Sequence, residues 1–117
     1  MAPRRKPLAV DDLTPGETLY IWRTRKGLDQ EQAAETLGTS YRVYGKWERD
    51  ESAAQSPKSV RVKARPSKLE TCILLRRRAG MKQRELASKM LCSTGWIKVL
   101  ESGRSDYEES LYDFWNV

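Results

Sequence analysis

The sequence contains no histidine and only two cysteines, Cys72 and Cys92. The absence of histidine removes the commonest general base and the commonest metal ligand. The two cysteines form no CxxC pair, so they indicate neither a four-ligand zinc site nor a disulfide framework. We therefore expect no metal and no cofactor, and we expect both cysteines to be small buried groups in a reducing cytosol.

Long apolar runs are also missing. No stretch approaches the roughly 20 apolar residues of a membrane span, and residues 1–17 hold no apolar run of signal-peptide length. The expectation is a soluble, cytoplasmic protein without a membrane contact. No histidine, cysteine dyad or clustered carboxylate pair is available for acid–base or metal chemistry, so we expect that the protein is not an enzyme.

Positive charge, by contrast, is in surplus. The 22 lysines and arginines exceed the 16 acidic residues, which gives a net charge of +6 and a pI near 9.5. Such a surplus suits an acidic partner, most often nucleic acid and less often an anionic membrane surface. A length of 117 residues allows one ordinary domain or two very small ones, and very small domains favour compact helical packing.

One segment of the sequence occurs twice, 53 positions apart. Residues 14–51 align with residues 67–104 without a gap, and nine of the 38 aligned positions are identical. The identical pairs are Glu17/Glu70, Thr18/Thr71, Arg23/Arg76, Arg25/Arg78, Gly27/Gly80, Gln30/Gln83, Ala34/Ala87, Ser40/Ser93 and Glu48/Glu101.

Each copy carries the signals of three short helices. In the first copy, Thr14 and Glu17 form a capping box that begins a helix, and Gly27 ends it. A second helix then precedes a tight turn and a third helix that begins at a serine cap. The predicted helices run to about Lys26, from about Gln30 to Leu37 and onward from Ser40, with counterparts that begin at Ser67, Gln83 and Ser93.

Two short helices joined by a three-residue turn, with alanine and apolar residues at fixed spacing, are typical of a helix-turn-helix. The segments GLDQEQAAETLGTSYRVYGKWERDE and GMKQRELASKMLCSTGWIKVLESGR resemble the lambda repressor/Cro-like family, also called XRE-type regulators. The resemblance implies an all-α fold of two tandem helix-turn-helix domains joined by a basic linker. It also implies an ion pair between the first helix and the end of the third in each copy, Arg23 with Glu48 and Arg76 with Glu101.

The resemblance further implies that the outward side of the third helix meets the base edges of double-stranded DNA. In the first copy these positions hold Tyr41, Arg42 and Lys46. Arginine and lysine can donate to guanine O6 and N7, while tyrosine can reach a phosphate or a thymine methyl group. Gln30 resembles the family glutamine that binds a phosphate, and Ser40 is a further candidate DNA contact. The alternatives are a solvated helix face, or a helical unit that does not contact DNA.

The second copy has lost most of this base-reading chemistry. Thr94, Gly95 and Val99 stand at the matching positions, and Leu91 replaces Gly38, which suits a left-handed turn residue far better. Either this copy contacts phosphates, or it has become a protein-binding surface anchored by Trp96. The candidate DNA contacts are Gln83, Ser93, Thr94 and Lys98, with Lys82 and Arg84 as additional charges.

The segments outside the repeat also carry charge patterns. The predicted domains are a basic arm (1–13), a first domain (14–51), a linker (52–66) and a second domain with a C-terminal helix (67–117). The arm is either a groove-binding segment or a solvated terminus. The linker alternates apolar and basic residues from Val60 to Arg65, which predicts an extended segment. The candidate DNA contacts of the arm are Arg4, Arg5 and Lys6.

The tail reverses the charge, with five acidic residues against Arg104 from residue 101 onward. Its aromatic and apolar residues recur at four-residue intervals, which predicts an amphipathic helix. This helix either closes the core of the second domain or forms a dimer contact, and paired readers suit palindromic sites. With Trp96, the candidate protein-interaction residues are Tyr107, Leu111, Phe114 and Trp115.

These observations favour a sequence-specific DNA-binding transcriptional regulator, a repressor of phage or bacterial mobile-element type that acts as a homodimer. The alternative is an adaptor, in which the first domain binds DNA while the second domain and the tail bind a protein partner or mediate dimerisation. The substitution Trp96→Ala distinguishes the two hypotheses. Loss of a protein partner or of the dimer, with DNA binding retained, would support the adaptor.

Overall fold

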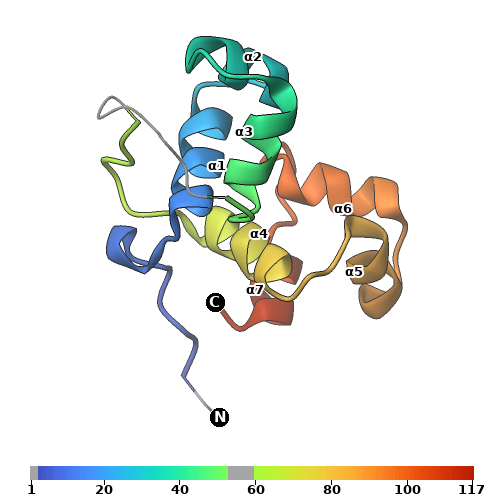
Figure 1. The fold of residues 1–117 in the computed structure, drawn as a ribbon. Helices are drawn as coiled ribbons and strands as arrows, with labels where there is room; N and C mark the ends of the chain where they lie inside the picture. Colours follow the sequence, from blue (N-terminus) through green and yellow to red (C-terminus); the bar gives the residue numbers. More distant parts are fainter. Residues whose placement is uncertain (1–2, 53–59) are drawn as a thin grey trace. The chain divides into compact units, whose positions relative to one another are not determined.

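The computed structural model describes residues 3–52 and 60–117, and the regular structure within these residues is helical throughout, as the all-α prediction requires (Figure 1). No helix in this part of the chain is long and apolar enough to pass through a lipid bilayer. A 3-10 helix, η1 (Val10–Asp12), comes first. The α-helices are α1 (Pro15–Arg25), α2 (Gln30–Thr36), α3 (Tyr41–Glu48), α4 (Lys68–Arg78), α5 (Gln83–Met90), α6 (Thr94–Glu101) and α7 (Glu109–Trp115).

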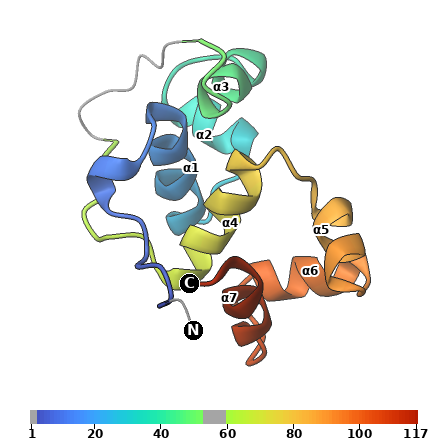
Figure 2. The ribbon, with the colours of Figure 1, turned by 90° about the horizontal axis from the view of Figure 1, so that it is seen from below.

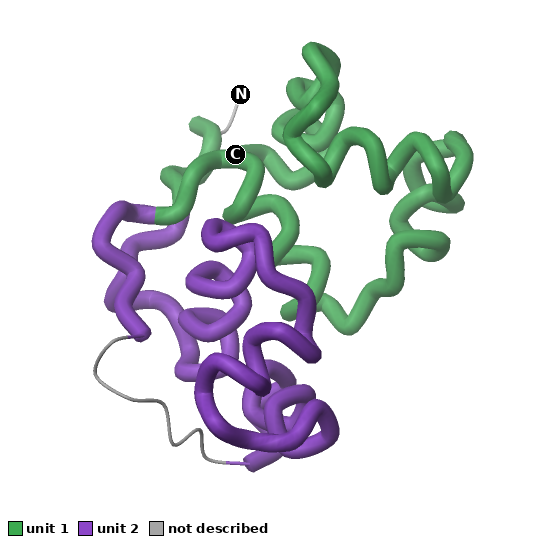
Figure 3. The backbone as a smooth tube through the Cα atoms, turned by 90° about the horizontal axis from the view of Figure 1, so that it is seen from above, with its two compact units in different colours: residues 1–7, 66–117 green, residues 8–65 purple. Residues whose placement is uncertain are grey.

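The chain forms two compact units (Figure 3). The unit here called the first, which is unit 2 (purple) in Figure 3, comprises the described part of residues 8–65. The unit here called the second, which is unit 1 (green) in Figure 3, comprises residues 66–117 together with residues 3–7. The basic arm expected at residues 1–13 is therefore divided, because its beginning lies with the second unit and its end with the first. Of the expected linker, residues 52 and 60–65 belong to the first unit and Pro66 belongs to the second, while residues 53–59 lie outside the described part.

Helices α1, α2 and α3 surround the core of the first unit (Figure 2). The predicted capping box begins α1, since the Thr14 hydroxyl accepts from the Glu17 amide at 3.1 Å and the Glu17 carboxylate accepts from the Thr14 amide at 3.0 Å. Gly27 ends this helix at a φ of 71°. The buried core consists of Leu19, Trp22, Ala33, Ala34, Tyr44, Trp47 and Val60.

Glycine at position 16 allows the first turn of α1 to approach the end of α3 closely. A Cβ on Gly16 would lie 2.5 Å from the carbonyl oxygen of Glu48 and 2.7 Å from that of Trp47. Asp50 completes the contact, because its carboxylate accepts from the Gly16 amide at 2.9 Å and from the Thr14 hydroxyl at 2.6 Å. This close approach fixes α3 against α1.

Val60 reaches the core of the first unit from the segment that was expected to be a linker. Val60 and Val62 are buried, while Arg61 and Lys63, which alternate with them, are exposed. The guanidinium of Arg25 fastens the same segment by donating to the carbonyl oxygen of Ala64 at 2.9 Å. The predicted alternation is present, but it serves packing, because residues 60–65 belong to the first unit.

The first helix of the second unit, α4, begins and ends like α1 but packs against a different helix. Ser67 and Glu70 form the matching capping box of α4, and Gly80 ends the helix at a φ of 70°. Leu69 occupies the position that corresponds to Gly16, and the main partner of α4 is α7 (Figure 2). The predicted C-terminal helix thus closes this core, which consists of Cys72, Leu86, Ala87, Ile97, Leu100, Leu111 and Val117.

The two cysteines differ in their surroundings. Cys72 is buried, and burial together with the nearby Glu101 carboxylate raises the pKa of its thiol to about 12. Such a thiol is neutral at physiological pH and behaves as a small apolar group. Cys92 is only half-buried, so the expectation of burial holds fully for the first cysteine alone.

Candidate nucleic-acid interface

Ser40 caps the start of helix α3, and its hydroxyl accepts from the Val43 amide at 3.2 Å. Its inward side carries Tyr44 and Trp47, which are buried in the core. Its outward side exposes the three predicted DNA-contacting side chains, and Tyr41 is 58% exposed. The helix thus has a buried anchoring face and a free basic face. The exposed residues of that second face are Tyr41, Arg42 and Lys46.

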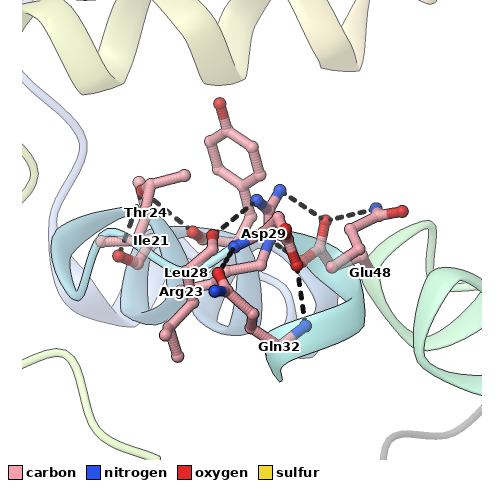
Figure 4. Close-up of polar contacts among 9 residues, drawn as sticks. Ile21, Arg23, Thr24, Leu28, Asp29, Gln32 and Glu48 are labelled. Atoms are coloured by element: carbon pink, nitrogen blue, oxygen red, sulfur yellow. Dashed lines mark hydrogen bonds and ion pairs between the residues drawn. The ribbon is translucent and has the colours of Figure 1, made fainter. Parts of the chain in front are cut away.

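The orientation of α3 is fixed by an ion pair that the resemblance implied. The Arg23 Nε and Nη2 atoms donate to the two carboxylate oxygens of Glu48 at 2.6 and 3.2 Å (Figure 4). Arg23 Nη1 also donates to the carbonyl oxygen of Leu28 at 3.1 Å, which ties the loop after α1 to the same arginine. The pair therefore joins α1, the following loop and α3.

Glu48 is buried and remains ionised because it is well bonded. Burial alone would raise the pKa of this carboxyl, but the hydrogen bonds from Arg23 and Gln30 and the charge of Arg23 outweigh it, so the pKa is lowered overall. The pKa of Arg23 is raised, because its hydrogen bond to Glu48 outweighs the effect of burial. Burial and the neighbouring carboxylate of Glu48 also raise the pKa of Tyr44, which is therefore neutral.

Gln30 has a second task that the sequence did not indicate. Its amide nitrogen donates to Glu48 at 3.0 Å, so the predicted phosphate-binding glutamine is also part of the ion-pair network. An amide has two N–H donors, which leaves one for an external acceptor. The same arrangement recurs in the second unit, where Arg76 donates to Glu101 at 2.7 Å and Gln83 donates to Glu101 at 3.0 Å.

A hollow of about 260 Å³ lies beside α3. Two of its lining residues, Gly45 and Arg49, were not predicted from the sequence. Arg42, Gly45 and Arg49 follow one another at spacings of three and four residues, and this helical periodicity was the available signal. The hollow is lined by Gln30, Tyr41, Arg42, Gly45 and Arg49.

In the second unit the helix that corresponds to α3 is α6. Ser93 caps it, and its hydroxyl accepts from the Trp96 amide at 3.1 Å. The residues at the reading positions are a half-buried threonine, a glycine and an exposed valine, with an exposed lysine beside them. The predicted contact residues of this unit that are exposed on the surface are Ser93 and Lys98, while Gln83 and Thr94 are half-buried.

Leu91 forms the turn before α6 in the left-handed conformation, with a φ of 56°. The matching residue of the first unit, Gly38, has a φ of 71°. Leucine is strained in this region because its Cβ crowds the backbone. Its side chain is 93% exposed, so burial does not compensate for the strain.

The predicted protein-interaction residues are partly surface and partly core. The rings of Trp96 and Tyr107 lie 6.0 Å apart, and these side chains are 38% and 68% exposed. Phe114 is also exposed. Leu111 is fully buried in the core of the second unit and Trp115 packs against that core, so Leu111 offers no surface to a partner.

The basic arm does not extend freely from the second unit. The Arg5 amide donates to the carbonyl oxygen of Asn116 at 2.8 Å, and Arg4 Nη1 donates to that of Val117 at 3.2 Å. Arg4 also forms an ion pair with Asp113. The acidic tail thus holds two of the three basic residues that were expected in a DNA groove or in solvent, while Lys6 is exposed.

Comparison with known proteins supports the geometry of the first unit. Residues 19–61 match a protein-family model described as Helix-turn-helix. No curated protein and no solved structure matches the chain. A second copy of the family domain at residues 67–117 therefore stays a prediction, while residues 19–61 are similar to the helix-turn-helix family, whose members are typically DNA-binding transcription regulators.

Proposed function

We propose that this protein is a sequence-specific DNA-binding transcription regulator in which α3 reads the major groove. The observation that carries the proposal is the exposure of Tyr41, Arg42 and Lys46 on one helix whose opposite face is buried. Arg42 and Lys46 would donate to guanine O6 and N7. The Arg23–Glu48 pair, buried against the core, holds the helix in one orientation, which base reading requires.

The proposed regulator acts as a repressor of phage or bacterial mobile-element type, in keeping with its resemblance to the lambda repressor/Cro-like family. A repressor of this kind occupies an operator and excludes the polymerase. Expression of a reporter placed behind a selected operator should fall when the protein is supplied. Increased expression would reverse the direction of regulation and leave the DNA-binding proposal in place.

Selection of binding sites from random duplexes tests the DNA-binding proposal. We expect enrichment of guanine-containing sites, because arginine and lysine are the residues that contact the groove. A short site contacted by one α3 indicates that α6 stays off the DNA. A long bipartite site that a single monomer binds would instead support DNA contacts by the second unit. Its candidate phosphate contacts are Gln83, Ser93, Thr94 and Lys98. Failure to enrich any sequence would contradict sequence-specific binding.

We propose in addition that the second unit mediates homodimerisation. It carries few base-reading groups, yet it exposes apolar side chains on and beside α6. Strain at an exposed leucine is a feature of functional positions, and Leu91 has no stabilising burial that explains it. Two chains together would supply two readers for a palindromic site. The surface consists of Leu91, Trp96, Val99 and Tyr107.

Sedimentation equilibrium of Trp96→Ala tests this second proposal. The wild type should be a dimer and the variant a monomer, while each first unit retains its affinity for a single half-site. A wild-type monomer would contradict homodimerisation. Loss of half-site binding in the variant would show that Trp96 acts on the fold or on DNA rather than on a partner chain.

A further inference from the structure

The beginning of the basic arm, residues 3–7, lies against the end of α7 within the second unit (Figure 2). The Arg5 amide donates to the carbonyl oxygen of Asn116 at 2.8 Å, and Arg4 Nη1 donates to the main-chain oxygen of Val117 at 3.2 Å. The second terminal nitrogen of Arg4 pairs with the Asp113 carboxylate. The arm is therefore attached through two main-chain oxygens and one side-chain carboxylate, although residues 3–7 form no helix or strand.

The main-chain oxygens that hold the arm belong to a well-defined turn at the end of α7. Asn116 ends the helix in the left-handed conformation, with a φ of 56°. The Val117 amide then donates to the carbonyl oxygen of Tyr112 at 2.9 Å, which is the bond of a Schellman motif. Since the Val117 side chain is buried in the core of the second unit, the turn is fixed and its outward oxygens are available to the arm.

The charged contact between the arm and α7 is weak enough to open. The side chains of Arg4 and Asp113 are 54% and 62% exposed. An ion pair in water contributes little stability, and salt screens it further. A DNA phosphate can replace the carboxylate, because a guanidinium donates to both groups in the same bidentate geometry. An anion from solution can therefore compete for Arg4.

The arm and the tail also differ in the sign of their charge. Residues 4–6 are three consecutive cations, whereas five acidic residues and one arginine occur from residue 101 onward. A duplex attracts the first segment and repels the second. While the arm lies on α7, Asp113 neutralises Arg4, so DNA must displace this carboxylate before it can bind the arginine.

We propose that the acidic end of α7 is an intramolecular competitor of DNA, which holds the basic arm in the free protein and releases it to a duplex. The inference rests on the proposed function and adds an autoinhibitory contact to it. Asp113 is the competing group, and Arg4 is the cation for which it competes. Because phosphate contacts carry no sequence information, the contact lowers the affinity for every duplex by the same factor.

The affinity of Asp113→Asn for DNA tests the proposal. It is measured for a selected operator and for a duplex of mixed sequence, from about 50 to 200 mM salt. Loss of an exposed ion pair should tighten binding to both duplexes by about two- to fivefold, with the operator preference unchanged. The gain should shrink as salt rises, because salt screens the pair that the wild type must break.

Asp106→Asn is the matched control, because it makes the same chemical change at an exposed residue before α7. It should leave both affinities unchanged. The double variant Arg4→Gln with Asp113→Asn should bind as Arg4→Gln does, since both changes act on one contact. The proposal is overturned if Asp113→Asn gains no affinity, if Asp106→Asn gains as much, or if the gain persists in the double variant.

Nuclear Overhauser contacts between Arg5 and Asn116 test the release of the arm directly. They should be present in the free wild type, weaker in Asp113→Asn and absent from the complex with the mixed duplex. Their absence from the free wild type, or their persistence in the complex, overturns the proposal. If the wild type binds neither duplex, the proposed function fails and the competition fails with it. Binding with the contacts intact instead overturns the competition alone, so the two failures are distinguishable.

Discussion

At the scale of single residues, the two units form the same turn with different chemistry. Gly38 adopts positive φ without a steric penalty, whereas Leu91 adopts it against the preference of its side chain. The exposed side chain of Leu91 contributes no buried area in return. Stability therefore does not account for leucine at this position, whereas the proposed contact with a second chain would.

Leu91→Gly should stabilise the isolated second unit by about 1 kcal/mol, because it relieves the strain and removes no buried contact. Urea unfolding under conditions where the protein is monomeric measures the change. The reverse substitution in the first unit, Gly38→Leu, should destabilise by a similar amount. A decrease in stability for Leu91→Gly would show that the leucine packs within its own unit.

At the scale of elements, the packing of α1 on α3 depends on one glycine. Gly16→Ala should lower the free energy of unfolding by about 1–3 kcal/mol, because its Cβ would meet the carbonyl oxygens of Glu48 and Trp47. Gly95→Ala is the matched control, since the nearest atom to its Cβ is 4.0 Å away and alanine favours the helix. Thermal unfolding should move in opposite directions for the two variants. Equal behaviour would contradict the close approach at Gly16.

The Arg23–Glu48 pair also acts between elements, and it makes stability depend on pH. The pKa of Glu48 is lower in the folded state than in the unfolded chain, so its contribution is complete above the unfolded value of about 4.5 and is lost as pH falls through the folded value. Glu48→Gln should therefore be less stable than the wild type at pH 7, by about 1–3 kcal/mol, and this difference should shrink below about pH 4. A difference that stays constant over this range, measured by urea unfolding, would contradict the assignment.

Local signals in the sequence predicted the helices well. The capping boxes at Thr14 and Ser67, the glycines at 27 and 80 and the serine caps at 40 and 93 act over four residues or fewer, so spacing alone reveals them. The ion pairs followed from the resemblance, and both are present. The outward face of α3 also followed from the resemblance, and its residues Tyr41, Arg42 and Lys46 are exposed.

Features that depend on distant contacts or on side-chain paths were not predictable in this way. The fastening of Arg4 and Arg5 to the C-terminal residues joins opposite ends of the chain. The burial of Val60 requires the assembled core of the first unit. Helical spacing places Arg42, Gly45 and Arg49 on one side of α3, but it does not specify that the Arg49 side chain bonds to Glu51.

At the scale of the whole molecule, the two units differ in what they present to a partner. The first presents arginine, lysine and tyrosine on α3, and the second presents leucine, tryptophan and valine on and before α6. Their shared arginine–glutamate–glutamine network maintains the same local geometry beneath different surfaces. The proposed division of labour is one reader and one assembly surface per chain.

The affinity of Arg42→Ala for a selected operator, compared with a mixed-sequence duplex, tests the DNA-reading claim most directly. Arg42 is exposed and belongs to no core contact, so the melting temperature should not change. We expect binding to the operator to weaken by about 1–3 kcal/mol and the preference over the mixed duplex to fall accordingly. Equal operator affinity and equal preference in wild type and variant would contradict the claim that α3 reads DNA.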